Sequence, residues 1–574
     1  MNNTIEPNIL EKAKYWTTAS FDEKTRNHVN ELINNNPQEL VECFYQDLDF
    51  GTGGLRGIMG VGTNRINQYT LGMATQGLCN YLKKEVAGKQ LSIAIAHDSR
   101  NNSKTFARQV AEVIAANGIK AYLFEDLRPT PELSFAIRHL GCDSGIVLTA
   151  SHNPKEYNGY KVYWNDGGQL VPPHDKGVID EVRKVNVEDI KFDFSDDLIE
   201  YIGEEVDRAY LDEVKKQSLN TAGKDDLKIV FTALHGTSIV TLPQALEENG
   251  FTQVSIVEKQ AKPDGNFPTV VSPNPEEAAA LQMAVDLANE TNADLVIGCD
   301  PDSDRVGLAV RDLNGQMILL NGNQTGAMLV DYVLRMNQQN GTMPKNPFIA
   351  ETVVTSDLIE KIGDAYNVPT KKCLTGFKWI AEIIRELEGK ETYLVGGEES
   401  YGYLIGDFVR DKDAITAAVL LAEVAAWAKA KGSSFYKELV QLYVNHGYYL
   451  ERLISITKKG KAGLEEIQKM IEDFRANPPK VLGGSPVIKI LDYKSGISTD
   501  IESGQESSIG LPSSNFIQFI TADGDKVTAR PSGTEPKIKF YFSVKSNLNS
   551  IDDFVDVTNQ LNAKIDQFVA DLGL

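Results

Sequence analysis

A single pattern governs the sequence from about residue 90 to residue 450: a short apolar run, a polar turn, and then apolar residues at helical spacing. Residues 91–96 form the first apolar run, and Phe106, Val110 and Ile114 follow at the spacing of a helix that ends at Gly118. Strands that alternate with helices build α/β layers with largely parallel sheets. The pattern therefore predicts an α/β fold.

The pattern restarts twice, so three related α/β units are predicted. Residues 227–231 lead into a polar turn at 232–237, and residues 347–350 lead into a turn at 351–356. Each unit also has a second apolar strand, and these strands end in unusual loops at residues 149–154, 298–305 and 396–400. Ligands of open α/β sheets bind at the carboxyl ends of the strands, so these three loops are expected to converge on one site.

The last part of the chain differs in pattern. A charged helix is predicted over residues 463–476, and it stops at an Asn-Pro-Pro sequence. Further on, Ile538, Phe540, Phe542 and Val544 alternate with polar residues, as in a half-exposed antiparallel sheet. A smaller C-terminal α+β domain is therefore predicted. The predicted domains span residues 1–210, 211–325, 326–448 and 449–574.

Composition limits the partners and the compartment. The 574 residues include 80 Asp and Glu against 58 Lys and Arg, which gives a net charge of −22. Such a surface repels nucleic acid but still allows a local basic pocket for a small anion. The five cysteines form no Cys-x-x-Cys pair, and neither a secretory leader nor a bilayer-length apolar stretch is evident. We expect a cytoplasmic protein with no nucleic-acid or membrane partner.

Three alternate aspartates, Asp300, Asp302 and Asp304, directly follow an apolar strand. Alternate side chains of an extended backbone share a face, and three carboxylates on one face repel each other unless a cation binds. Such hard oxygen ligands suit Mg²⁺. An EF-hand is excluded because its required Gly and Glu positions hold Arg305 and Arg311. A solvated acidic turn is the alternative.

Ser151 lies in the small polar loop at residues 149–154, with His152 beside it and Lys161 nearby. A serine nucleophile needs a base or a metal to activate it. The loop lacks the Gly-x-Ser-x-Gly pattern of α/β-hydrolases. A helix N-cap is the alternative role for this serine.

Two further loops carry groups suited to phosphate and sugar. Residues 530–534, Arg-Pro-Ser-Gly-Thr, combine a guanidinium fork, hydroxyls and an open backbone, which suits a phosphate cradle; an ordinary hairpin turn is the alternative. Glu398 and Ser400 stand two residues apart in a glycine-rich loop and suit vicinal sugar hydroxyls. The glycine-rich residues 51–57 contain Arg56 but lack the third glycine of a dinucleotide site. Together these groups indicate phosphoryl transfer on a sugar phosphate.

In chain order these motifs resemble those of the α-D-phosphohexomutase superfamily, over nearly the whole chain. Residues 149–154 resemble its phosphoserine loop, 300–305 its Mg²⁺ loop, 397–400 its sugar loop and 530–534 its phosphate loop. Three further segments resemble the phosphoglucomutase / phosphopentomutase branch: residues 51–57, 159–164 and 375–379.

The resemblance implies three related α/β domains and a smaller C-terminal α+β domain around a central active-site cleft. It implies that Ser151 carries phosphate in the active enzyme and binds Mg²⁺ together with Asp300, Asp302 and Asp304. Glu398 and Ser400 would bind sugar hydroxyls. The substrate's non-reacting phosphate would be held by Arg530, Ser532, Gly533 and Thr534. The residues that would contact the substrate or the transferring phosphoryl group are Arg56, Lys161, Arg305, Thr375 and Lys412.

The general base stays open between Lys161, His152 and Lys412. Some phosphomannomutase-type members have a histidine two residues past the sugar-loop serine, where this chain has Gly402. The implied reaction interconverts glucose 1-phosphate and glucose 6-phosphate, with glucose 1,6-bisphosphate as intermediate and activator. Phosphopentomutase, phosphomannomutase and sugar-1,6-bisphosphate synthase are alternatives within the family, and a phosphatase or a non-catalytic sugar-phosphate binder is the alternative outside it. We expect a monomer, with a dimer as the alternative.

Overall fold

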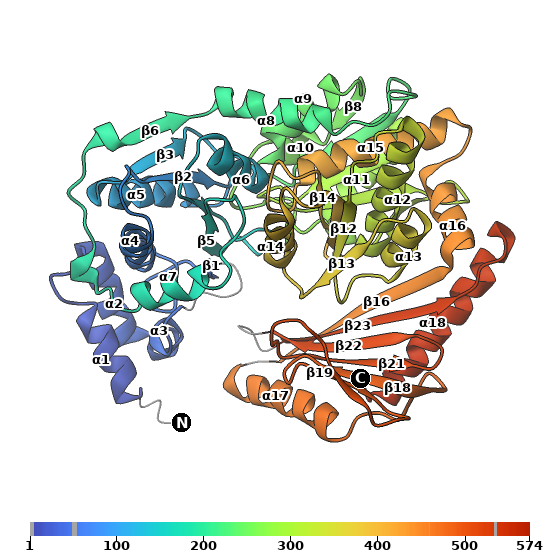
Figure 1. The fold of residues 1–574 in the computed structure, drawn as a ribbon. Helices are drawn as coiled ribbons and strands as arrows, with labels where there is room; N and C mark the ends of the chain where they lie inside the picture. Colours follow the sequence, from blue (N-terminus) through green and yellow to red (C-terminus); the bar gives the residue numbers. More distant parts are fainter. Residues whose placement is uncertain (1–4, 49–53, 459, 533–536) are drawn as a thin grey trace.

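The structure is a computed structural model that describes residues 5–48, 54–458, 460–532 and 537–574 (Figure 1). Its strands form four sheets, built from β1–β6, β7–β11, β12–β15 and β16–β23. We call the parts around the first three sheets the first, second and third unit, and the part around the fourth the C-terminal domain. The prediction of three α/β units followed by a smaller sheet-rich domain is confirmed.

The three units repeat one topology. Their sheets contain the orders β5-β4-β2-β3, β10-β9-β7-β8 and β15-β14-β12-β13. In each, the last three strands are parallel, and the first runs antiparallel to its neighbour. In the first unit the elements are β2 (Ser92–His97), α5 (Ser103–Ala116), β3 (Lys120–Phe124), α6 (Thr130–His139), β4 (Ser144–Leu148) and β5 (Tyr157–Trp164). In the second they are β7 (Lys228–Thr232), α9 (Ser238–Glu248), β8 (Gln253–Ile256), α11 (Ala278–Thr291), β9 (Leu295–Cys299) and β10 (Val306–Arg311). In the third they are β12 (Pro347–Thr352), α13 (Leu358–Ala365), β13 (Thr370–Cys373), α14 (Phe377–Leu387), β14 (Thr392–Glu398) and β15 (Gly402–Ile405).

In each unit one central strand ends in a predicted functional loop: β4 in the first unit, β9 in the second and β14 in the third. After the loop the chain returns as the antiparallel neighbour β5, β10 or β15. The loop is thus the connection at the carboxyl end of a central strand. Buried apolar side chains fix these strands on both faces, so the loops leave the sheets from rigid positions.

One continuous core joins the second unit, the third unit and the C-terminal domain. It includes Leu133 of α6, Leu246 of α9, Leu420 of α15 (Ala414–Ala430) and Phe540 of β23 (Lys537–Ser546). The outer face of the first sheet has its own core under α4 (Gln68–Glu85), α5 and α7 (His174–Val182). Helix α6 packs on the opposite face and so connects the first unit to the common core.

The apolar helix α15 is buried along nearly its whole length. Its one acidic side chain, Glu423, accepts hydrogen bonds from the backbone of Leu219 and Asn220, both 2.8 Å, and pairs with Lys224 at 2.7 Å. The high hydropathy of this helix therefore reflects a position at the centre of the protein. Among the described residues, no helix combines the length and apolar character required to cross a bilayer.

The C-terminal domain has an antiparallel sheet. Its elements are β16 (Tyr448–Thr457), α17 (Gly460–Ala476), β17 (Val481–Leu482), β18 (Ser485–Asp492), β19 (Ile497–Asp500), β20 (Glu506–Ser508), β21 (Ile517–Thr521), β22 (Lys526–Pro531), β23 and α18 (Phe554–Asp571). The predicted face of Ile538, Phe540, Phe542 and Val544 is buried. On the other face Lys545 is exposed and Lys539 is partly exposed, as expected, but Tyr541 is buried in a cluster with Val353 and Leu374 of the third unit, so the expected half-exposure holds for only part of β23.

Three helices precede the first sheet and were not anticipated: α1 (Pro7–Tyr15), α2 (Glu23–Asn35) and α3 (Pro37–Phe44). They enclose a core around Trp16, Phe21 and Phe44 that packs against Tyr69 of α4 (lower left in Figure 1). The other predicted strands and helices lie within a few residues of their expected positions. The proposed domain boundaries stay predictions.

Glu351 is a fully buried carboxyl group at the end of β12. Lys372 Nζ lies 3.5 Å from it, and neither carboxylate oxygen has a hydrogen-bond partner among the described residues. Burial raises the pKa of Glu351 to about 8, although the Lys372 charge opposes the rise. The group is therefore protonated in the folded protein at neutral pH and ionised in the unfolded chain.

This difference predicts a pH-dependent stability. Between its usual pKa of 4.5 and about 8, Glu351 takes up a proton on folding, so the group makes the free energy of unfolding fall as the pH rises through that window, by at most about 1.4 kcal/mol per pH unit. We expect Glu351→Gln to reduce this decline. Melting temperatures measured across that window test it, with Glu360→Gln as control, because Glu360 contacts the same Lys372 at 2.9 Å but is 44% exposed. Parallel curves for wild type and Glu351→Gln would contradict the buried-proton account.

Candidate functional site

The acidic loop between β9 and β10 is closed on itself by Asp300. Its Oδ1 accepts the backbone N–H groups of Asp304 and Arg305, both at 3.1 Å, and Ser303 adopts a left-handed conformation with φ 57°. This turn places Asp300, Asp302 and Asp304 so that one oxygen from each lies within 4.8 Å of the others. All three side chains are buried. The predicted clustering of the three carboxylates is thus present.

Three helix starts hold the backbone of this loop. Thr130 N of α6 donates to Asp302 O at 2.8 Å, Thr237 N ahead of α9 donates to Pro301 O at 2.9 Å, and Ala414 N of α15 donates to Ser303 O at 3.2 Å. The first N–H groups of a helix lack partners within the helix, so they are available for such contacts. Each helix belongs to a different unit. The acidic loop is therefore positioned by all three units together.

Ser151 lies directly against the acidic loop. Its Oγ donates to Asp300 Oδ2 at 2.7 Å and lies 3.1 Å from His152 Nδ1, and its backbone N–H donates to Thr149 Oγ1 at 2.8 Å. Ser151 is buried and has a φ of 51°, a conformation unusual for a residue with a side chain. It is not a simple helix cap. The predicted serine and the predicted carboxylates form one centre.

Two lysines neutralise the carboxylates. Lys161 Nζ of β5 lies 2.7 Å from Asp302 Oδ2 and 3.0 Å from Asp304 Oδ2, and Lys412 Nζ lies 2.9 Å from Asp304 Oδ2. Lys161 comes from the first unit and Lys412 from the third, and both are buried. The first and third units thus each contribute one ammonium group to the acidic loop of the second unit.

The charges of this centre shift its titration. Burial and then the Asp302 charge raise the pKa of Asp300 well above its usual range. Burial also favours the neutral form of Asp304, but Lys161 and then Lys412 outweigh it and hold its pKa well below the usual range. The pKa of Lys412 is raised, because Asp304 outweighs the effect of burial. Burial, and next the charge of Arg305, lower the pKa of His152, so its imidazole is neutral.

The acidic centre has unfilled ligand positions. Asp302 Oδ1 and Asp304 Oδ1 are buried and have no hydrogen-bond partner among the described residues. Buried carboxylate oxygens without donors are costly unless a cation coordinates them. An all-oxygen set of three carboxylates and a serine suits a hard divalent ion. These residues fit a bound metal.

The sugar loop follows β14. Glu398 is buried and its Oε1 accepts the backbone N–H of Gly376 at 2.8 Å, which places it beside Thr375. Tyr401 O accepts Val306 N at 3.0 Å, so the loop that contains Ser400 is attached to the strand leaving the acidic loop. Burial, and next the charge of Glu398, raise the pKa of Glu399 to about 7. Glu398 therefore lies beside Thr375, and the loop of Ser400 is joined to the strand that leaves the acidic loop; their sugar-binding role stays a prediction.

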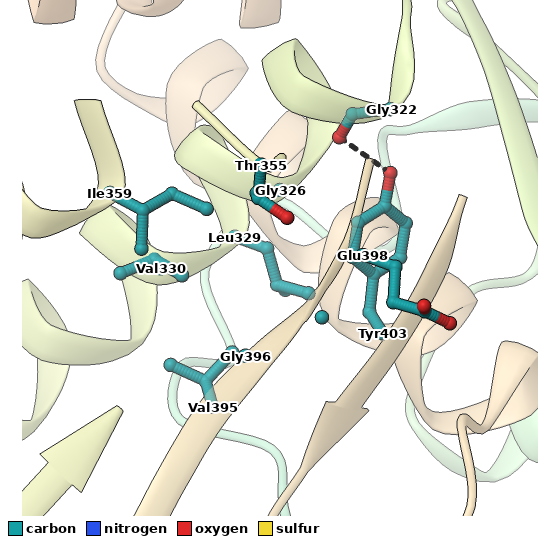
Figure 2. A pocket seen from close by; sticks show the side chains of 11 residues that line it. Gly322, Gly326, Leu329, Val330, Thr355, Ile359, Val395, Gly396, Glu398 and Tyr403 are labelled. Atoms are coloured by element: carbon teal, nitrogen blue, oxygen red, sulfur yellow. Dashed lines mark hydrogen bonds between the residues drawn. The ribbon is translucent and has the colours of Figure 1, made fainter. Parts of the chain in front are cut away.

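A cavity of about 10 Å³ lies behind this loop and is drawn in Figure 2. Leu329, Val330 and Ile359 line it, and Tyr403 closes it with a hydrogen bond from its hydroxyl to Gly322 O at 2.8 Å. In Figure 2 the Glu398 carboxylate points away from these apolar side chains. The space holds about one water molecule, so it is no sugar site. Glu398 presents its carboxylate on the opposite side.

Other predicted residues lie near the serine loop, the acidic loop or the loop after β14. Arg56 of β1 (Gly54–Ile58) donates to Asn153 Oδ1 of the serine loop at 3.0 Å. Arg305 pairs with Glu276 at 2.5 Å. Arg530 lies on β22 next to Lys539 of β23, and both cations oppose the rise in the pKa of Glu399. Ser532 follows β22, whereas Gly533 and Thr534 lie outside the described residues.

Several residues of the site were not identified from the sequence. Thr130, Glu276 and Asp411 contact Asp302, Arg305 and Lys412, respectively. Arg100 lies in the polar turn after β2 and donates to the serine loop. Each of these residues either lies far from its partner in the sequence or stands in a turn whose sequence is common in proteins. Arg100 could have been identified only from the pairing of β2 with β4, because their carboxyl ends place the turn of Arg100 next to the serine loop.

Comparison with known proteins matches the three units to one family. Residues 47–188, 208–315 and 321–443 match α/β/α domains I, II and III of the family described as phosphoglucomutase/phosphomannomutase. The phosphoglucomutase of Staphylococcus epidermidis strain RP62A is 38% identical over 544 residues, which cover 94% of this chain and 97% of that protein. The phosphoglucomutase of Staphylococcus aureus strain MRSA252 is 39% identical over 531 residues, 92% and 94% of the two chains.

Solved structures share the fold at lower identity. Parafusin, a phosphoglucomutase from Paramecium in an open form, superposes with a TM-score of 0.66 at 18% identity and covers 92% of this chain and 97% of that chain. A phosphomannomutase-like protein from Thermus thermophilus gives a TM-score of 0.64 at 21% identity, over 87% and 96% of the chains.

The buried carboxylates predict divalent-ion binding that one substitution weakens. Asp302→Asn removes one charge and one unpartnered oxygen, so we expect Mg²⁺ affinity to fall by roughly 10-fold or more, as one of few hard ligands is lost. Calorimetric titration measures the affinity, and the Mg²⁺-dependent rise in melting temperature gives a second readout. Asp411→Asn is the control, since Asp411 is equally buried and contacts Lys412 but lies outside the triad. Equal Mg²⁺ affinity in wild type and Asp302→Asn would show that the triad binds no ion.

Proposed function

The chain belongs to the phosphoglucomutase/phosphomannomutase family of α-D-phosphohexomutases and is an enzyme of phosphate transfer; from that premise we propose that it interconverts glucose 1-phosphate and glucose 6-phosphate. One observation carries the proposal: the Ser151 hydroxyl lies 2.7 Å from Asp300 inside a buried triad of carboxylates. A binding protein needs neither a nucleophile nor a metal site. The staphylococcal relatives named phosphoglucomutase support glucose as the sugar.

In this proposal Ser151 carries the phosphoryl group and transfers it to a free sugar hydroxyl. Mg²⁺ held by Ser151, Asp300, Asp302 and Asp304 would polarise the seryl phosphate. Phosphoryl transfer depends mainly on in-line positioning and on neutralised oxygens. Lys161, Lys412 and Arg305 supply fixed positive charge beside Asp302 and Asp304, and the serine loop also binds Arg56 through Asn153.

The acid–base group must be able to change protonation. Lys161 and Lys412 hold their protons tightly, because the carboxylates raise the pKa of each against the effect of burial. His152 is neutral and lies 3.1 Å from Ser151 Oγ, which supports it for the serine end of the reaction. The group that serves the sugar hydroxyl stays open among Lys161, His152 and Lys412.

The rest of the substrate would lie between the sugar loop and the phosphate loop. Glu398, Ser400 and Thr375 would bind the hydroxyls. The non-reacting phosphate would be held by Arg530, Ser532, Gly533 and Thr534. Transfer from Ser151 yields glucose 1,6-bisphosphate, which turns over and returns its other phosphate to Ser151. Because both ends carry the same dianion, one cradle serves both half-reactions.

Gly402 supports the choice of branch. A Cβ atom at this position would lie 2.3 Å from Lys412 Cδ, so the absence of a side chain makes room for the lysine. A histidine at 402 would displace Lys412 from Asp304. Phosphopentomutase and sugar-1,6-bisphosphate synthase stay alternatives, and a monomer in the cytoplasm stays our expectation.

A serine substitution tests the proposed chemistry. Ser151→Ala removes the acceptor of the phosphoryl group, so we expect intact-mass analysis to find one phosphate on the wild type and none on the variant. Mutase activity of the variant should be below detection.

A panel of glucose, mannose, ribose and deoxyribose 1-phosphates, with and without glucose 1,6-bisphosphate, identifies the sugar. Full activity of the alanine variant would exclude a phosphoserine enzyme, and faster turnover of ribose 1-phosphate would favour the phosphopentomutase alternative.

The packing of Gly402 against Lys412 predicts a coupled effect. Gly402→Ala should displace Lys412 and lower kcat/KM by roughly 10-fold or more, as expected for loss of one charged group at a reacting phosphate. In a Lys412→Met background the same alanine should have little further effect. Additive losses in this double-mutant cycle would show that Gly402 acts independently of Lys412.

A further inference from the structure

We propose, on the basis of the proposed function, that Arg100 is a positioning residue that holds the serine loop in place through its backbone carbonyls, an arrangement that we call the clamp. Its guanidinium donates to four backbone carbonyls, three in that loop and one at Tyr157, the first residue of β5. Nη2 donates to Ser151 O at 2.6 Å and also to Asn153 O, and Nη1 donates to Pro154 O at 2.8 Å and Tyr157 O at 3.1 Å. A single side chain therefore binds the carbonyl groups along most of the loop.

The loop depends on such a partner because of its own conformation. Ser151 has a left-handed φ of 51°, which costs energy for a residue with a Cβ and persists only where the surroundings hold it. Buried carbonyl groups outside regular structure also need donors. The planar, always charged fork of arginine meets several carbonyls at once, whereas a lysine ammonium is a single point. The residue type fits the task.

Arg100 is itself held in place by two units. Its Nε lies 3.2 Å from Asp98 Oδ2, and both side chains are fully buried. The ring of Phe267 from the second unit stacks on the guanidinium, with its centroid 5.0 Å from Cζ. Gly265 makes this approach possible, because a Cβ there would lie 2.2 Å from Asn101 N. The clamp is therefore a joint between the first and second units.

The joint acts on the reaction through Ser151. The hydroxyl that touches Asp300 and the carbonyl that accepts from Arg100 belong to the same residue, so a shift of the backbone moves the nucleophile relative to the acidic triad. The proposed sugar-binding groups Glu398 and Ser400 lie on the third unit, whereas Arg100, Asp98 and Phe267 belong to the first and second units. Loosening the clamp should therefore affect turnover rather than substrate affinity.

The test compares two buried arginines. Arg100→Lys keeps the charge but loses the fork, and we expect kcat to fall roughly 10- to 100-fold with KM for glucose 1-phosphate changed by less than about 3-fold, as for a misplaced reacting group. Arg65→Lys is the matched control, since Arg65 is 6% exposed and donates to Glu42 O and Asn64 O but does not touch the serine loop. It should leave kcat nearly unchanged.

Amide hydrogen exchange gives a readout independent of activity. In Arg100→Lys the amides of Asn153 and Tyr157 should exchange faster, because Arg100 binds the backbone carbonyls of these two residues. The amides of β4 should exchange at an unchanged rate. If Arg100→Lys does not fold, Phe267→Leu removes the stacked ring and should show the same pattern at smaller size. Unchanged exchange in the loop, or an equal kcat loss in Arg65→Lys, would overturn the proposal. A wild type inactive on glucose 1-phosphate would overturn the proposed function, while faster loop exchange in Arg100→Lys would still support the clamp.

Discussion

The architecture depends on keeping three carboxylates together inside the protein. Buried like charges repel strongly at low dielectric, and Asp300, Asp302 and Asp304 all lie below the surface. The compensation comes from outside their own loop: Lys161 from the first unit, Lys412 from the third, and helix starts from all three units that donate to the loop backbone. The acidic centre therefore exists only when the units are assembled. This requirement explains why three copies of one topology meet at the ends of equivalent strands.

Sequence patterns predicted the parts of this centre that lie within one loop. Asp300 directly follows β9, Ser151 lies in the loop after β4, and Glu398 is the last residue of β14. The carboxyl ends of equivalent strands converge, so the meeting of these residues followed from the repeated topology. Contacts made by residues from other units were not predictable in this way. Thr130 starts an ordinary helix, and only the packing of the first unit on the second gives it Asp302 as a partner. Glu276 and Arg100 find their partners within their own units, but at positions 29 and 51 residues away in the chain.

The misjudged elements have the same origin. The alternation on β23 indicated one solvent-exposed face, but the third unit covers part of that face, where Tyr541 packs with Val353 and Leu374. A strand pattern does not reveal what packs against the strand. The three N-terminal helices were overlooked because the α/β pattern starts after them. They pack on α4 through Tyr69, and the turn that precedes α4 is tied to them by Arg65, which binds Glu39 and Glu42. Tertiary packing decides such features, and periodicity reports only local preference.

The acidic centre and Arg530 lie in differently built regions of the protein. The acidic loop is fixed by backbone hydrogen bonds from three units, and the serine loop beside it is held by Arg100. Arg530 belongs to a sheet that contacts the third unit through the Tyr541 cluster and the Lys526–Asp357 ion pair at 3.0 Å. A mutase must place first one and then the other phosphate at the same serine. In the proposed function, a reacting centre fixed by three units and a cradle that binds either phosphate dianion would meet that demand, because the substrate would reverse while the enzyme groups keep their places.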